Sequence, residues 1–198
     1  MNNHYEKLAD ELNALANGFP RTKTGSDIAL LEFIYNEAEA ELAGQLSGQW
    51  ETADAIAKRL GRIRKEVLSG LFVLVRGGKA WMNKKDGKML FRLAPFIVGS
   101  YEAHVEHMNA EMAVLVSRYM QDGGMVGIMQ PQPALHRVVP TVESSDLEWI
   151  LPYDNVMEIL NNAKSFHVQD CICRKLMDSE DKGCDAPMHN CLSFSNVE

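Results

Sequence analysis

All four cysteines of this 198-residue chain lie between residues 171 and 191, in the run CICRKLMDSEDKGCDAPMHNC. The N-terminus has no apolar signal segment, and no apolar run approaches the roughly 18 residues of a membrane span, so the sequence predicts a cytoplasmic protein with no membrane contact. In a reducing compartment, clustered cysteines are more often metal ligands or redox thiols than structural disulfides. We therefore expect a cysteine-rich unit that holds a metal.

The cysteine spacing, C-x-C-x10-C-x6-C, narrows the kind of metal site only in part. It lacks the paired C-x2-C knuckles of structural zinc sites and the C-x2-C-x2-C run of bacterial ferredoxins. Four thiolates suit a [4Fe–4S] cluster, a [2Fe–2S] cluster or zinc, so the ligand count leaves these alternatives open. Asp185 and His189 are possible substitute ligands, but with four thiols available we expect them to surround the site or lie on the surface.

Basic side chains are concentrated in the middle of the chain. Residues 58–92 contain eleven basic residues and two acidic ones, a net charge of +9, whereas the rest carries nine basic and 25 acidic residues, a net charge of −16. A basic island in an acidic protein indicates a surface for an anionic partner such as DNA. A solvated face without a partner is the plainer alternative.

The spacing of apolar residues predicts helices over residues 5–15, 27–35, 37–46, 53–60 and 63–75. Ser26, Asn36 and Thr52 are expected as N-caps of the second, third and fourth of these helices, because their short polar side chains can accept from free helix N–H groups. Gly61 predicts a tight turn between the last two helices. The pattern is that of a helix-turn-helix.

Two runs of strand-compatible residues within 79–95 flank the pair Asp86-Gly87, which is a strong signal for a tight hairpin turn. Three helices followed by a basic hairpin is the order of a winged helix, in which the second helix of the pair and the hairpin would contact phosphates. Docking of a protein partner is the alternative use of such a module. The predicted nucleic-acid contacts are Arg62, Arg64, Lys65, Lys84, Lys85 and Lys88.

Residues 95–120 predict one long helix, because its apolar residues follow a heptad spacing. Such a stripe can pair with its symmetry mate in a homodimer or pack on its own domain. His104, His107 and Glu111 lie close together on this predicted helix, but they match no recognised ligand spacing for a metal. The stripe consists of Tyr101, Val105, Met108, Met112, Leu115 and Tyr119.

Glycine and proline residues between 121 and 146 predict a linker that ends in a strand over residues 136–142, followed by a helix around Val156, Ile159 and Leu160. The predicted fold class is α+β and mostly helical. We expect a helical and winged-helix domain over residues 1–95, a long linking helix over 96–122, and a small cysteine-rich metal-cluster unit over 123–198.

Nearly the whole chain resembles a family of iron–sulfur proteins of anaerobic bacteria, described as 4Fe-4S ferredoxin-type proteins with an N-terminal winged helix. The resemblance is carried by DCICR, KGCDAPMHNCLSF, ILPYDNVMEIL and GFPRTKTGSDIALLEFIYNEAEAELA. It implies an iron–sulfur cluster, most simply 4Fe-4S, held by Cys171, Cys173, Cys184 and Cys191. Members of the family continue into further cysteine-rich segments that this sequence does not contain.

Two classes of function follow from these expectations. In the first, the cluster state of a redox protein controls the hold of the basic module on DNA; in the second, the protein is an electron-transfer accessory whose winged helix docks a redox partner enzyme. A zinc-stabilised winged-helix protein is a third alternative. The sequence contains no nucleophile–base pair, phosphate-binding loop or dinucleotide fingerprint, so we do not expect an enzyme with a substrate of its own.

Overall fold

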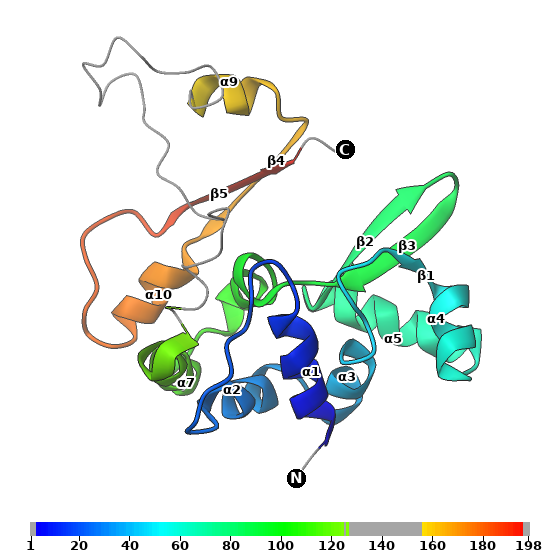
Figure 1. Cartoon of the computed structure of the whole chain (residues 1–198). Helices are drawn as coiled ribbons and strands as arrows, with labels where there is room; N and C mark the ends of the chain where they lie inside the picture. Colours follow the sequence, from blue (N-terminus) through cyan, green and yellow to red (C-terminus); the bar gives the residue numbers. More distant parts are fainter. Residues whose placement is uncertain (1–2, 125, 127–155, 196–198) are drawn as a thin grey trace.

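The computed structural model describes residues 3–124, 126 and 156–195 of the chain. Within them the fold is α+β, mostly helical, with a three-stranded and a two-stranded antiparallel sheet (Figure 1). The predicted fold class is confirmed at this level. The predicted linker and the strand over residues 136–142 lie almost wholly outside the described residues.

The N-terminal helices form because their apolar residues recur at helical spacing and meet in one core. Helix α1 buries Tyr5, Leu8 and Leu12, as its sequence predicts. Helix α1 packs on α2 and α3, and α2 packs on α7. Their bounds are α1 (Asn3–Asn13), α2 (Ser26–Ile34), α3 (Glu37–Ala43), α4 (Ala53–Leu60), α5 (Arg64–Arg76) and α7 (Ala110–Tyr119).

Two of the three predicted caps are confirmed. Asn36 accepts from the Glu39 N–H, and the Glu39 side chain accepts from the Asn36 N–H, both at 2.9 Å, which completes a capping box. Thr52 Oγ1 accepts from the Ala55 N–H at 3.2 Å. The prediction for Ser26 is wrong by one residue, because Gly25 takes the cap position in a left-handed conformation and Ser26 is the first helical residue.

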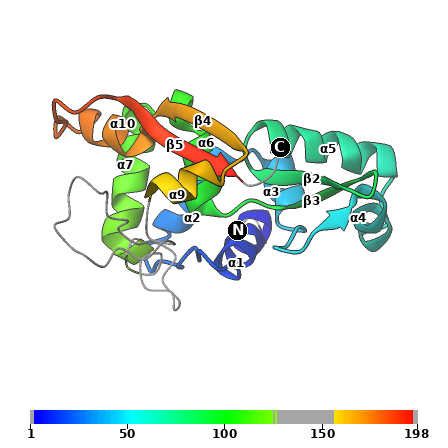
Figure 2. The same cartoon turned by 90° about the horizontal axis from the view of Figure 1, so that it is seen from above.

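A three-stranded sheet, in the strand order β1-β3-β2, has one strand before the helix pair α4 and α5 and two after it. Its strands are β1 (Glu51–Thr52), β2 (Ala80–Lys85) and β3 (Lys88–Leu93). The predicted turn is confirmed: Asp86 and Gly87 both have positive φ, 52° and 75°, which fixes the pairing of Lys85 with Lys88. Figure 2 shows the hairpin β2–β3 extending beside α4 and α5.

The predicted single helix over residues 95–120 is wrong. The backbone leaves the helical conformation at Ile97, Val98 and Gly99, and a new helix begins after Asn109, whose side chain accepts from the Met112 N–H at 2.9 Å. Three short segments lie before α7: η1 (Phe96–Ser100), α6 (Tyr101–Ala103) and η2 (Val105–His107). One short segment, η3 (Met120–Gly124), follows α7.

The apolar stripe of this region faces the core of its own chain. Four of its six residues are buried, and Met108 and Leu115 pack partly buried against them. Packing on its own domain, the alternative to a helix seam between two copies, is therefore confirmed for the stripe, and it gives no reason to expect a homodimer.

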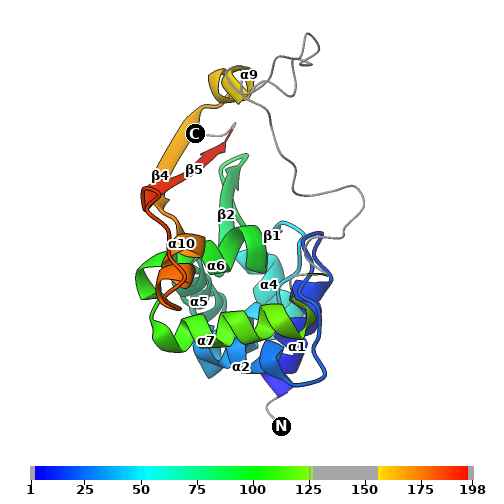
Figure 3. The same cartoon turned by 90° about the vertical axis from the view of Figure 1, so that its left-hand side faces the viewer.

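The C-terminal unit consists of α9 (Val156–Asn161), β4 (Ser165–Asp170), α10 (Ile172–Asp178) and β5 (His189–Ser195). Strands β4 and β5 pair antiparallel and rise away from the helices, while α10 lies against α7 and α6 (Figure 3). Ile172 and Leu176 of α10 are 2% and 7% exposed and belong to the same core as the N-terminal helices. In α9 the predicted inward residues are only half-buried. None of the helices in the described part is long and apolar enough to cross a membrane.

Candidate metal centre and basic surface

Three of the four cysteines converge where β4, α10 and β5 meet. Cys171 directly precedes α10, and Cys173 lies in its first turn. Cys191 is on β5, where it pairs with Gln169 of β4. Because the Cys171 N–H donates to the Met188 carbonyl at 2.9 Å, the start of the helix is tied to the approach of β5. Thiols that are far apart in sequence therefore come together.

Two of these thiols, Cys173 and Cys191, lie in a setting that favours their neutral form. Burial raises the pKa of Cys173, and Cys171, Glu102 and Cys191 raise it further. Burial also raises the pKa of Cys191, with Cys171 and Glu102 acting in the same direction. Within the described residues, the groups that act on these two thiols are all thiols or carboxylates. Such a site accumulates negative potential when it ionises, so it favours a cation that replaces the thiol protons.

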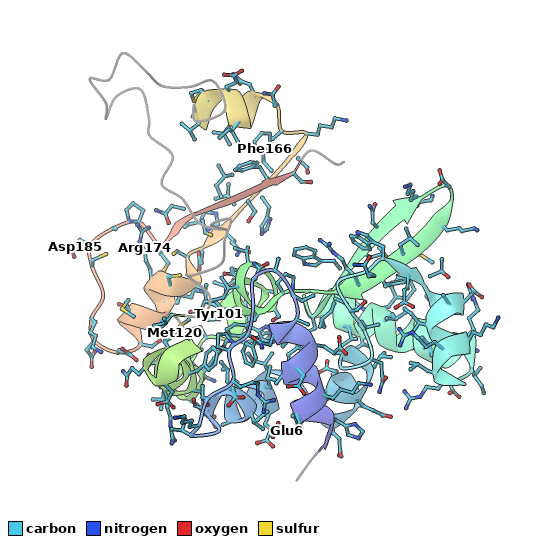
Figure 4. The ribbon with its side chains drawn as sticks, in the orientation of Figure 1. Glu6, Tyr101, Met120, Phe166, Arg174 and Asp185 are labelled. Carbon is cyan, nitrogen blue, oxygen red and sulfur yellow. The ribbon has the colours of Figure 1, made fainter. Side chains whose placement is uncertain are left out.

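Tyr101 and Glu102 of α6 form the other side of this site, a contribution that the sequence did not predict. Burial raises the pKa of Tyr101, and the charges of Cys173, Glu102 and Cys171 raise it further, so the phenol lies within electrostatic reach of these two thiols. Burial likewise raises the pKa of Glu102, whose Oε2 accepts from the Gly99 N–H at 2.7 Å. Figure 4 shows Tyr101 where α6 meets α10.

The hydroxyl of Tyr101 is an orphan. The side chain is 2% exposed, and among the described residues its oxygen has no hydrogen-bond partner. A buried hydroxyl without a partner costs roughly 1–3 kcal/mol, so the great majority of such groups in folded proteins are paired. A donor of this kind near the thiols of Cys171 and Cys173 fits an anionic sulfur group bound at the site.

Cys184 stands apart from the other three predicted ligands. It is exposed, on the loop between α10 and β5, and this loop swings away from α10 (Figure 4, where Asp185 marks it). Arg174 of α10 donates to the carbonyl of Pro187, near the end of this loop. As the side chains stand, no group of three or more His, Cys, Asp or Glu in the described chain is arranged to hold a metal ion. A site of four thiolates therefore requires this loop to move inward and the side chains of the other three cysteines to reorient.

The other residues that were weighed as metal ligands, and not expected to be, have different partners. His189 Nδ1 lies 3.0 Å from an Asp170 carboxylate oxygen. Buried His104 hydrogen-bonds the Ser100 carbonyl through Nδ1 at 2.6 Å, and its ring centroid is 5.8 Å from that of His107. Glu111 lies beyond the break before α7. These residues do not form a second metal site within the described chain.

The predicted nucleic-acid contacts divide into two groups. Arg62 forms an ion pair with Glu41, and Arg64 Nε lies 2.8 Å from Asp54. Three lysines flank the hairpin turn and are called the turn lysines: Lys84, Lys85 and Lys88. They and Lys65 are exposed and make no ion pair within the described residues. Arg64 and Lys88 line one cavity of about 390 Å³ between α4, α5 and the hairpin turn. The structure thus brings the hairpin and the start of α5 to one side of the module.

Comparison with models of known protein families finds no match to this chain, and comparison with curated proteins finds none either.

Proposed function

We propose that this protein binds an iron–sulfur cluster through Cys171, Cys173 and Cys191, with Cys184 delivered as the fourth ligand by its loop. The observation that carries the proposal is the approach of three thiols to one another, two of them near the Tyr101 hydroxyl, which has no partner among the described residues. Four cysteine ligands suit a 4Fe-4S cluster, which would supply one-electron transfer.

The residues of this chain would act on such a cluster in distinct ways. The anchoring of Ile172 and Leu176 in the core fixes the two thiols at the start of α10. Strand β5 brings in the third thiol, and α6 covers the site from the other side. Glu102 lies next to the thiols, so in its ionised form it would favour the more oxidised, less negative form of whatever is bound.

Zinc is the second candidate for this site, because a set of three or four thiolates also suits a tetrahedral zinc ion. Elemental analysis of the full chain purified without oxygen separates the two. Iron together with acid-labile sulfide supports the cluster, whereas stoichiometric zinc without sulfide would replace the proposal by a structural metal site.

We further propose that α3, β1, α4, α5, β2 and β3 form a winged-helix module. Its support is the order of these elements along the chain together with the strand order β1-β3-β2. In the regulator form of this proposal, Lys65 and the turn lysines neutralise DNA phosphates, and the state of the cluster changes the hold of the module on DNA. Four neutralised phosphates predict a slope of about −3.6 in log K against log salt, at roughly −0.9 per phosphate.

Docking of a redox partner enzyme is the second candidate for the module. Two observations favour it: the predicted arginines are engaged in ion pairs, and Ile63 and Val73 of the α5 region are 64% and 44% exposed. Titration of the full chain with duplex DNA over a range of salt concentrations distinguishes the two uses. A slope near the expected value supports the regulator, and unmeasurable binding at low salt supports docking.

A further inference from the structure

The outer face of the three-stranded sheet carries an arginine between two tryptophans. Trp81 of β2 pairs with Arg92 of β3, and the pairing of Glu51 with Phe91 puts Trp50 next to Arg92 on the other side. The guanidinium carbon of Arg92 is 4.5 Å from the Trp81 ring centroid and 4.6 Å from that of Trp50. Since β3 is the central strand, the two indoles approach the guanidinium from opposite sides.

This guanidinium has no acidic partner among the described residues. Its Nε is buried and unpaired there, whereas Arg21, Arg59, Arg62 and Arg64 each form an ion pair. Burial lowers the pKa of Arg92, which means that its charge has lost part of its hydration. A desolvated cation without a counter-charge is costly, so the site favours an anion.

A cavity of about 550 Å³ adjoins Arg92. Its walls come from the sheet, the end of α1 and the loop after α3, and it is lined by Leu15, Asn17, Gln49, Trp81 and Pro95 among others. A volume of this size accommodates a small organic molecule. Glu11 is the acidic residue of the lining.

We propose that this cavity is a binding site for a small organic anion, a carboxylate or a phosphate monoester with an apolar body. The two indoles cover the faces of the guanidinium, so its free edge is left to bind two oxygens of one acid group in the same plane. The apolar body then lies against Trp81, Leu15 and Pro95. Because Glu11 repels a second negative charge, the site prefers a monoanion to a dianion.

The test uses the full chain with Trp149→Phe, which removes the one tryptophan of the three that lies outside the described residues. Benzoate and phenyl phosphate are titrated while indole fluorescence and the Arg92 Nε–H resonance are followed. We expect saturable binding of both probes, with both signals changing together. Arg92→Gln should abolish binding. Arg92→Lys should weaken binding at least tenfold, because an ammonium group is not planar and cannot stack between the indoles or donate two parallel hydrogen bonds to one acid group. Arg76→Gln, an equal loss of charge at an exposed residue of α5, should leave binding unchanged.

Glu11→Gln gives an independent readout if the Arg92 variants fail to fold. It should tighten phenyl phosphate a few fold and benzoate less, because the phosphate ester carries more negative charge. Equal effects on both probes, or no saturable binding of either, would overturn the proposal. A single-stranded oligonucleotide that binds through Arg92 while both small anions fail would identify the face as a nucleic-acid surface and would equally overturn it. None of these outcomes depends on whether the cysteines hold a cluster.

Discussion

Replacement of Tyr101 by Phe should have opposite effects on the metal-free and the metal-loaded protein. The change removes one oxygen from a side chain that is 2% exposed and keeps the ring that packs against Phe96, with centroids 5.7 Å apart. In the metal-free form the hydroxyl is buried without a partner among the described residues. Since that state costs roughly 1–3 kcal/mol, the variant should raise the free energy of unfolding by about 1 kcal/mol.

In the loaded form the same hydroxyl would donate to an anionic sulfur. A hydrogen bond to a charged group contributes about 1.5–3 kcal/mol, so its loss should weaken metal binding by tenfold or more. The variant is therefore expected to be more stable without metal and to release its metal more easily.

Urea unfolding of the metal-free protein and competition with a chelator, both without oxygen, measure the two effects. Tyr119→Phe is the matched control: Tyr119 is equally buried, but its hydroxyl donates to the Pro20 carbonyl at 3.2 Å. The control should lose about 1 kcal/mol of stability and keep its metal affinity. If Tyr101→Phe behaves like the control, the hydroxyl has a partner within the protein and our assignment is refuted.

Three further outcomes are expected. Cys191→Ser should lose bound metal entirely, whereas Cys184→Ser, which alters the exposed loop, should retain part of it in elemental analysis; equal loss would show that all four thiols bind alike. Reversing the charge of the turn lysines to Glu should abolish DNA binding in a salt titration without lowering the thermal midpoint, since exposed lysines contribute little to stability; an unchanged DNA affinity would leave the docking function. Asp27→Asn should cost about 3 kcal/mol at neutral pH, because the carboxylate is 1% exposed and lies 2.6 Å from Arg21. Burial alone would raise the pKa of Asp27, but hydrogen bonds from Thr22 and Arg21 lower it. The stability that the Asp27 carboxylate contributes is therefore present above about pH 4 and is lost as the pH falls further. An acid-unfolding curve of Asp27→Asn that lacks this loss of stability supports the role of the carboxylate, and a curve like that of the unchanged protein contradicts it.

Features set by neighbouring residues could be predicted from the sequence. Asn36 and Thr52 cap helices because their side chains reach N–H groups three residues away, and Asp86-Gly87 makes a hairpin by its own backbone preferences. The same turn sets the strand register that pairs Trp81 with Arg92, so their contact could also have been predicted from the sequence. The approach of Trp50 could not be predicted in this way, because Trp50 precedes β1, which pairs with β3 from a distant part of the sequence.

The predicted long helix failed because spacing alone does not show continuity. A run of apolar residues every three or four positions also describes two short helices that pack on one core, and here the break lies between them. Asn109 was a local signal for a helix start that the apolar stripe outweighed. The approach of Tyr101 and Glu102 to cysteines some seventy residues away depends on how α10 packs, which no local pattern contains.

The bent segment between β3 and α6 joins two places that could otherwise act separately. Pro95 lines the anion cavity, and Asn17 from the same cavity donates to the Ile97 carbonyl. At the other end of the segment, the Gly99 N–H holds Glu102 beside the thiols. An anion that shifts this backbone would change the affinity of the thiols for the proposed metal, and linkage then requires that metal to change the affinity for the anion by the same factor. If both proposed sites are occupied, the chain would thus report the supply of a small acid to the proposed metal site, and the state of that site to the cavity.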